Sequence, residues 1–119
     1  MAVYSTHKDL NVWKKSIQLT KDVYQTTGVF PEEEQFGITS QMRRASVSIA
    51  SNIAEGYGRK FDKERSRFLN IALGSASELE TQIIISKELK FIDDNSYNDL
   101  TAKTAEIIRM LASLIKIMN

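Results

Sequence analysis

The chain has 119 residues, 42% of them hydrophobic and 26% charged, which suits one soluble domain with its own core. It contains no cysteine and one histidine, so the sequence excludes disulfides and thiolate metal sites and argues against a histidine-based metal site or catalytic triad. The formal net charge is +1. This value argues against a surface wholly adapted to polyanions, although a local basic patch remains compatible with it.

No apolar run approaches the roughly 20 residues that a membrane span needs. The N-terminal residues also lack the apolar core of a signal peptide. We therefore expect a cytoplasmic protein without a membrane partner, and we expect no metal ion and no cofactor.

Apolar periodicity predicts four helices and no repeats in a single domain covering residues 1–119. The predicted helices run from about 11 to 27, 38 to 57, 63 to 90 and 95 to 118. Short connections favour an all-α fold, an antiparallel up-down-up-down four-helix bundle. Gly56 and Gly58 are predicted to end the second helix in the left-handed conformation.

The core faces follow from the spacing of apolar residues. The first helix shows a main stripe of Leu10, Trp13, Ile17, Thr20 and Tyr24, and a weaker one of Val12, Leu19 and Val23. The second helix should bury Ile38, Met42, Ala45, Ile49 and Ile53. Phe30 and Phe36 are predicted to plug one end of the bundle, and the phenylalanines as a group to pack rather than to stack on bases.

A second apolar sector on the second helix points to a contact between copies of the chain. Small side chains there would let another backbone approach closely. The predicted oligomer interface comprises Arg43, Val47, Ala50, Ala54, Leu73 and Ile84.

The third sector of the second helix is polar. We expect it to form a structural polar network of Arg44, Ser48, Asn52, Glu55 and Glu80, with Glu80 pairing with Arg43 or Arg44. Adjacent arginines diverge by about 100° on a helix, so Arg43 and Arg44 cannot serve one site. Both a structural role and a phosphate-binding role remain open for this pair.

Basic residues cluster after the second helix, with Phe61 as an aromatic neighbour. This cluster, a candidate nucleic-acid-binding site, comprises Arg59, Lys60, Lys63, Arg65 and Arg67. Cations at such density can bind a phosphate backbone by releasing its counterions. The alternative is a solvated turn at the start of a helix.

The sequence does not indicate an enzyme, and we predict no catalytic residues. Glu55, Glu78 and Glu80 are the carboxylates expected near packed faces, and nothing in the pattern makes two of them converge. The glycines near Arg59 do not form a phosphate loop, because GxxxxGK[ST] is absent.

Three segments, DLNVWKKS, FPEEEQFGITSQMRRASVSIASNIAEGYGR and FLNIALGSASELET, resemble the 23S rRNA intervening-sequence proteins, four-helix-bundle proteins historically labelled ribosomal proteins. The resemblance implies a homopentameric ring of antiparallel bundles and no established catalytic residues. A related branch, the accessory protein of diversity-generating retroelements, binds nucleic acid and a reverse transcriptase through a basic surface.

Two hypotheses follow. In the first, the protein is a non-enzymatic homo-oligomer that binds RNA or DNA through the basic cluster. In the second, it is an oligomeric scaffold that binds a protein partner, and its basic residues serve solubility.

Overall fold

The computed structural model describes residues 6–118, which form an all-α bundle. Within these residues four α-helices carry the fold, and two short 3-10 helices precede α1 and α2. Their bounds are His7–Asp9 (η1), Asn11–Thr27 (α1), Glu32–Glu34 (η2), Ile38–Tyr57 (α2), Asp62–Glu88 (α3) and Asp94–Met118 (α4). The all-α four-helix prediction is confirmed, and each predicted helix boundary lies within two residues of the observed one.

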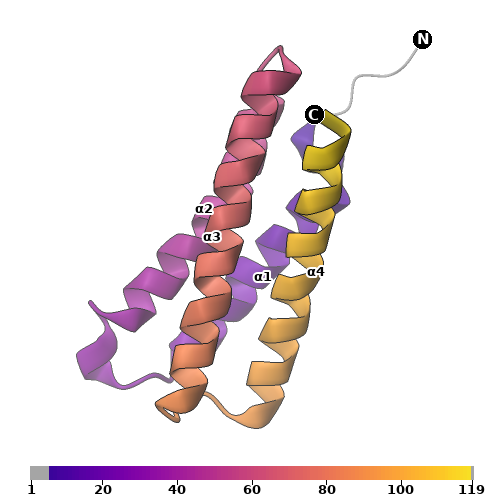
Figure 1. Ribbon diagram of the computed structural model, residues 1–119. Coiled ribbons are helices and arrows are strands. Elements are labelled where there is room, and N and C mark those ends of the chain that lie inside the picture. The colour runs from indigo at the N-terminus through magenta and orange to yellow at the C-terminus, as the bar shows by residue number, and fades with distance from the viewer. Residues whose placement is uncertain (1–5, 119) are drawn as a thin grey trace.

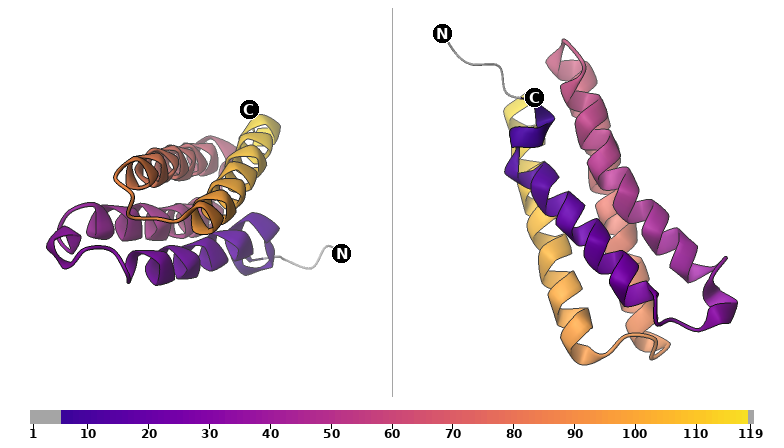
Figure 2. Two further views of the ribbon diagram at one scale, coloured as in Figure 1. Left: turned by 90° about the horizontal axis from the view of Figure 1, so that it is seen from below. Right: turned by 180° about the vertical axis from the view of Figure 1, so that it is seen from behind.

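The bundle is elongated, with principal extents of 51 × 24 × 22 Å. Each helix packs against two others among the described residues: α1 and α3 both contact α2 and α4. The α2–α3 turn lies at the same end as the start of α1 and the end of α4, and it projects beyond α4 (Figures 1 and 2). The other two connections lie at the opposite end.

The core runs through the centre of all four helices. Its most deeply buried large side chains are Val12, Leu19, Val23, Met42, Ile49, Ile53, Leu69, Leu79, Ile83, Leu100, Ile107 and Leu111. Several hydroxyl groups within it are satisfied locally. The hydroxyls of Ser16, Ser86 and Thr104 each donate to the carbonyl four residues earlier, which removes the cost of burying an unpaired hydroxyl.

On α1 the weaker of the two stripes faces the core. Val12, Leu19 and Val23 are buried, whereas Ile17 and Tyr24 are exposed. Thr20 lies at the boundary, where its hydroxyl donates to the carbonyls of α1 and α2. The prediction that the main stripe faces the core is therefore wrong for Ile17 and Tyr24.

One of the two phenylalanines predicted to plug the bundle end does so. Phe30 is buried and its ring centroid lies 5.5 Å from that of Phe91. Phe36 is 90% exposed, because η2 turns its backbone away from the bundle before α2 begins.

The predicted left-handed glycines are also wrong, because no glycine among residues 6–118 has a positive φ. Gly58 ends α2 in the right-handed region, and its N–H donates to the carbonyls of Ala54 and Glu55. Within the described residues, Lys90 alone has positive φ, at 63°. It ends α3, and the N–H of the next residue, Phe91, donates to the carbonyl of Ser86, the bonding pattern of a Schellman motif.

Candidate nucleic-acid interface

The turn between α2 and α3 is tight because α3 passes very close to Gly56. A Cβ at this position would lie 3.1 Å from the Arg65 carbonyl oxygen and 3.1 Å from the Phe68 Cβ. Gly56 thus lies inside α2 and permits the approach of α3, a role different from the helix stop that the sequence suggested. The approach brings the residues on both sides of the turn together. We call residues 57–68 the hairpin tip.

The three arginines of the hairpin tip lie over aromatic rings. The guanidinium carbons of Arg59 and Arg67 lie 4.8 Å and 5.4 Å from the Phe68 ring centroid. That of Arg65 lies 4.8 Å from the Tyr57 centroid. Each is within the range in which a cation is attracted to a ring face. These contacts limit the rotamers of the arginines, so their charges are held in place before any ligand binds.

Polar contacts add to this arrangement. Arg59 forms an ion pair of 2.7 Å with Glu55 one helical turn earlier, and Arg65 donates to the Arg59 carbonyl at 3.0 Å. Burial raises the pKa of the Tyr57 hydroxyl, while the nearby Arg65 charge lowers it by a smaller amount. Tyr57 therefore remains a neutral ring at physiological pH.

The two lysines of the hairpin tip are free. Lys60 and Lys63 are exposed, and neither makes a hydrogen bond or ion pair with any residue from 6 to 118. Between them Phe61 is 67% exposed. The predicted basic cluster therefore comes together as three oriented guanidinium groups, two exposed and unpaired ammonium groups and one exposed ring.

The rest of the chain extends this positive region. We define the basic end as residues 6–18, 48–75 and 107–118, the halves of the four helices nearest the hairpin tip; it holds ten basic and four acidic residues. The acidic end, residues 19–47 and 76–106, holds six basic and eleven acidic residues. Beyond the hairpin tip, the basic end includes Lys8, Lys14, Lys15, Arg109 and Lys116. The net charge of +1 therefore conceals a bundle with opposite charge at its two ends.

Sequence reasoning missed those five residues, because they are scattered along the chain. These residues can be identified only from the arrangement of the helices in the fold. Residues near the start of α1 and near the end of α4 reach the same end of the bundle as the α2–α3 turn (Figure 1).

Much of the predicted oligomer interface lies on the surface. Val47 and Ile84 are exposed, and Ala54 and Leu73 are half-buried. Ala50, however, is only 7% exposed in the single chain, so its own subunit already covers it. Arg43 is also engaged within the chain. It donates to the Thr27 hydroxyl at 2.9 Å, and its guanidinium lies 4.6 Å from the Tyr24 ring centroid.

The predicted polar network forms only in part. The Ser48 and Ser75 hydroxyls are 2.8 Å apart, and the Asn52 amide donates to the Ser48 carbonyl and hydroxyl. Glu55 pairs with Arg59 instead. The predicted pairing of Glu80 with Arg43 or Arg44 is absent from the ion pairs of residues 6–118, because Arg43 turns toward α1 and Arg44 toward solvent.

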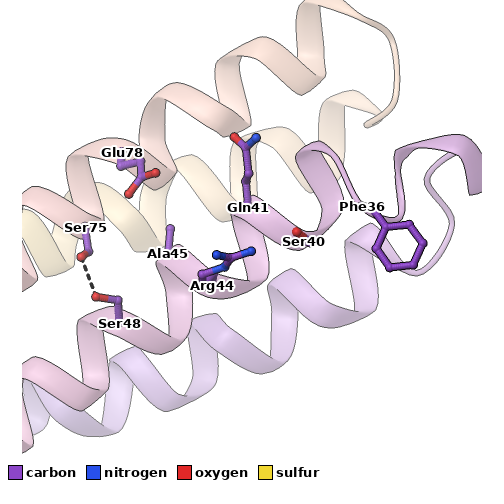
Figure 3. Close-up of a pocket in the computed structure, with 8 residues that line it drawn as sticks. All are labelled: Phe36, Ser40, Gln41, Arg44, Ala45, Ser48, Ser75 and Glu78. Carbon is purple, nitrogen blue, oxygen red and sulfur yellow. Dashed lines mark hydrogen bonds between the residues drawn. The ribbon is translucent and has the colours of Figure 1, made fainter.

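Arg44 lines a groove of about 430 Å³ between α2 and α3. Arg44 and Gln41 come from α2, Ser75 and Glu78 from α3, and the dashed line joins Ser48 to Ser75 (Figure 3). Arg44 makes no hydrogen bond or ion pair within the described part of the chain. Two of the groove residues, Arg44 and Ser48, belong to the predicted polar network, whereas Phe36, Ala45 and Glu78 were predicted in other places, so the groove itself was not predicted.

Within residues 6–118 there is no group of three or more metal-ligating side chains suited to a metal ion. Over the same residues, no helix has the length and hydropathy needed to cross a bilayer.

Comparison with known proteins agrees with the fold. A search of curated proteins found no match. The crystal structure of a protein of unknown function from the S23 ribosomal protein family of Bacteroides thetaiotaomicron is similar, with a TM-score of 0.80 and 27% sequence identity. The match covers 88% of this chain and 98% of that one. The family described as 23S rRNA-intervening sequence protein matches residues 8–113. The chain therefore belongs to the 23S rRNA-intervening sequence protein family.

Proposed function

We propose that this protein is a non-enzymatic, self-associating protein that binds RNA through its basic end. The observation that carries the proposal is the segregation of charge along the bundle, with ten basic and four acidic residues in the half that ends in the hairpin tip. A polyanion is attracted to one end of such a molecule and repelled by the other. The family name, which refers to 23S rRNA, supports RNA as the polyanion.

The hairpin tip offers two kinds of contact to a phosphate backbone. Arg59, Arg65 and Arg67 present guanidinium groups that aromatic rings already hold in place, so little side-chain entropy is lost on binding. Lys60 and Lys63 provide ammonium groups that adapt to the position of a phosphate. Binding of this type depends strongly on salt, because each contact releases condensed counterions.

A binding role also accounts for the carboxylates better than catalysis does. Glu55 is paired with Arg59, and Glu78 accepts a hydrogen bond of 3.3 Å from Gln82. Of these three carboxylates, only Glu78 lines the groove between α2 and α3. These carboxylates therefore do not converge on one cleft, as a general acid and base must.

We further propose that copies of the chain associate, as the pentameric ring implied by the family resemblance. The support in the structure is a set of exposed apolar side chains on α2 and α3, which includes Val47, Ile71 and Ile84. Association would multiply the basic ends in one particle, and linked sites bind a long polymer far more tightly than single ones.

Light scattering at micromolar concentration tests the association. Val47→Glu and Ala54→Glu each place a charge on the proposed contact, and we expect either to reduce the particle mass. Ala50→Glu is not suitable for this purpose, because burial of Ala50 within the chain means that the variant would unfold. A wild-type protein with the mass of a monomer would refute the association.

Fluorescence anisotropy with labelled RNA across a salt series tests the binding. Replacing Lys60 and Lys63 together by alanine should weaken binding, and the slope of log affinity against log salt should fall by about 0.7 for each contact to a single strand that is lost. Lys21→Ala is the matched control, because Lys21 is also exposed but lies in the acidic end. Absence of binding at low salt, or an equal effect of the control, would contradict the proposal.

One observation favours the scaffold function as a second candidate. An apolar groove of about 280 Å³ lies between the start of α1 and the end of α4, lined by Leu10, Val12, Met110, Leu114 and Ile117, among others. Ile117 is 79% exposed. A protein partner that remains bound after nuclease treatment, and that Ile117→Lys releases, would support the scaffold over RNA binding.

A further inference from the structure

Phe61 is exposed in the turn between α2 and α3, which projects beyond the end of α4 (Figure 1). It precedes the first residue of α3, with an extended backbone (φ −109°, ψ 142°), and its carbonyl accepts the Arg65 N–H. Its backbone thus contributes to the start of the helix, whereas its ring is 67% exposed and takes no part in the core. The chain itself gives no packing reason for an aromatic ring at this position.

The neighbouring aromatic residues behave differently. Phe68 is half-buried and carries the guanidinium groups of Arg59 and Arg67, and Tyr57 carries that of Arg65. These rings are already occupied by cations from the same chain. Phe61 is flanked in sequence by Lys60 and, two residues later, by Lys63, both of which are free. A ring without a stacking partner therefore lies within a group of cations.

We infer that Phe61 is a stacking platform for an unpaired base, so that the hairpin tip recognises single-stranded RNA or an unpaired segment of a larger RNA. This inference rests on the proposed RNA-binding function and adds the type of RNA. A base stacked on an aromatic side chain, with basic residues along the backbone, is the general arrangement of single-strand binding. A phenylalanine carries no hydrogen-bonding group, so this contact selects for unpaired bases and tolerates any sequence.

A duplex would not satisfy this geometry. Its bases are stacked on each other, and the deep, narrow major groove of an RNA helix does not admit side chains. The ring would then remain in water while only the cations made contact. Single strands and loops, by contrast, present base faces and phosphates together.

The test compares Phe61→Ala with Phe36→Ala in anisotropy titrations of a labelled single-stranded RNA and of the duplex of the same sequence. Phe36 is the matched control, because it is 90% exposed but lies in the acidic end. We expect Phe61→Ala to weaken single-strand binding roughly 5- to 150-fold, the range observed for loss of one base–aromatic stack. The salt slope should not change, because no phosphate contact is lost. Phe36→Ala should have no effect.

Phe61→Trp provides a second test, in which the fluorescence of the new tryptophan reports stacking directly. It retains a stacking surface and should therefore bind within about twofold of the wild type, and single-stranded RNA should quench the added tryptophan fluorescence. Trp13 contributes a background fluorescence, which is measured separately with the wild-type protein. Circular dichroism of each variant checks the fold, which an exposed side chain should not affect.

The outcomes separate this inference from the proposed function. If the wild type binds no RNA at low salt, both fail. If it binds RNA and Phe61→Ala binds equally well, or if the wild type prefers the duplex, only the stacking inference fails. It is also overturned if Phe61→Ala alters the particle mass in light scattering, since Phe61 is then a contact between copies. The inference is also overturned in favour of a membrane surface if the wild type binds phosphatidylserine vesicles and Phe61→Ala loses this binding while its RNA binding is unchanged.

Discussion

The close approach of α3 to Gly56 leads to a quantitative prediction for Gly56→Ala. Alanine is favoured over glycine inside a helix by about 1 kcal/mol of unfolding free energy. The added methyl group would lie 3.1 Å from the Arg65 carbonyl oxygen and 3.1 Å from the Phe68 Cβ. Both atoms belong to or adjoin the backbone, so α2 and α3 must separate, and such overpacking costs about 1 to 3 kcal/mol. We expect a net loss of about 1 kcal/mol.

Gly74→Ala is the matched control. Gly74 lies within α3, and a Cβ there would meet no atom within 4 Å. The full gain of about 1 kcal/mol should therefore appear in the unfolding free energy. The two variants should differ by about 2 kcal/mol, or about 8 °C in melting temperature for a chain of this length. Urea denaturation followed by circular dichroism measures both. If Gly56→Ala stabilises the protein as much as Gly74→Ala does, the close approach does not control the α2–α3 turn.

Three further predictions concern the bundle. Lys90→Gly should raise the unfolding free energy by about 0.5 to 1 kcal/mol in the same assay, because glycine adopts the left-handed φ of 63° without steric cost; no gain would show that Lys90 is not strained. Ile49→Ala should lower the unfolding free energy by about 2 to 5 kcal/mol, because Ile49 is fully buried; a loss below 1 kcal/mol would place this residue outside the core. The Asp93 carboxylate accepts the N–H of Ser96 at 2.7 Å, which lowers the Asp93 pKa from its usual 3.8. The ionised Asp93 carboxylate therefore stabilises the fold above pH 3.8, and this stabilisation is lost as the pH falls through the lowered pKa. The difference in unfolding free energy between the wild type and Asp93→Asn should shrink in acid. A difference that is constant with pH would contradict the hydrogen bond.

The helices were predictable because their local signals agree with their packing. The α4 stripe of Leu100, Thr104, Ile107 and Leu111 alternates by three and four residues, and all four side chains are buried. The α2 stripe is buried over Met42, Ala45, Ile49 and Ile53 for the same reason. Where one apolar stripe dominates a helix, its spacing alone identifies the core face.

The first helix shows the limit of this reasoning. Two stripes compete on α1, and the one with the weaker periodicity faces the core. The choice between them depends on α2, whose Ser46 is buried and accepts from Thr20 at the boundary of the contact. Leu19 faces inward and Ile17 is exposed because of how α1 packs against α2 and α4, and no pattern within α1 contains this information.

The glycines and the exposed phenylalanines show a second limit. A glycine near a helix end suggests a left-handed stop, but Gly56 is required by the distance to Arg65, a residue nine positions later. Phe36 and Phe61 look like core residues by composition, yet the turns that carry them point their rings into water. Both errors come from tertiary geometry at the connections, where burial depends on the path of the backbone rather than on residue type.

The candidate site shows why net charge was a poor guide to function. A net charge of +1 argues against a surface wholly adapted to polyanions, but the opposite charges that cancel in this sum need not be mixed on the surface. The bundle separates them instead, because the turn with Arg59 and Lys60 lies at one end and Glu32–Glu34 and Asp93–Asp94 lie at the other. The helices are long enough to place these groups about 40 Å apart at 1.5 Å per residue, several times the screening length at physiological salt. A phosphate backbone at the hairpin tip would therefore be attracted by the basic end without opposition from the acidic one.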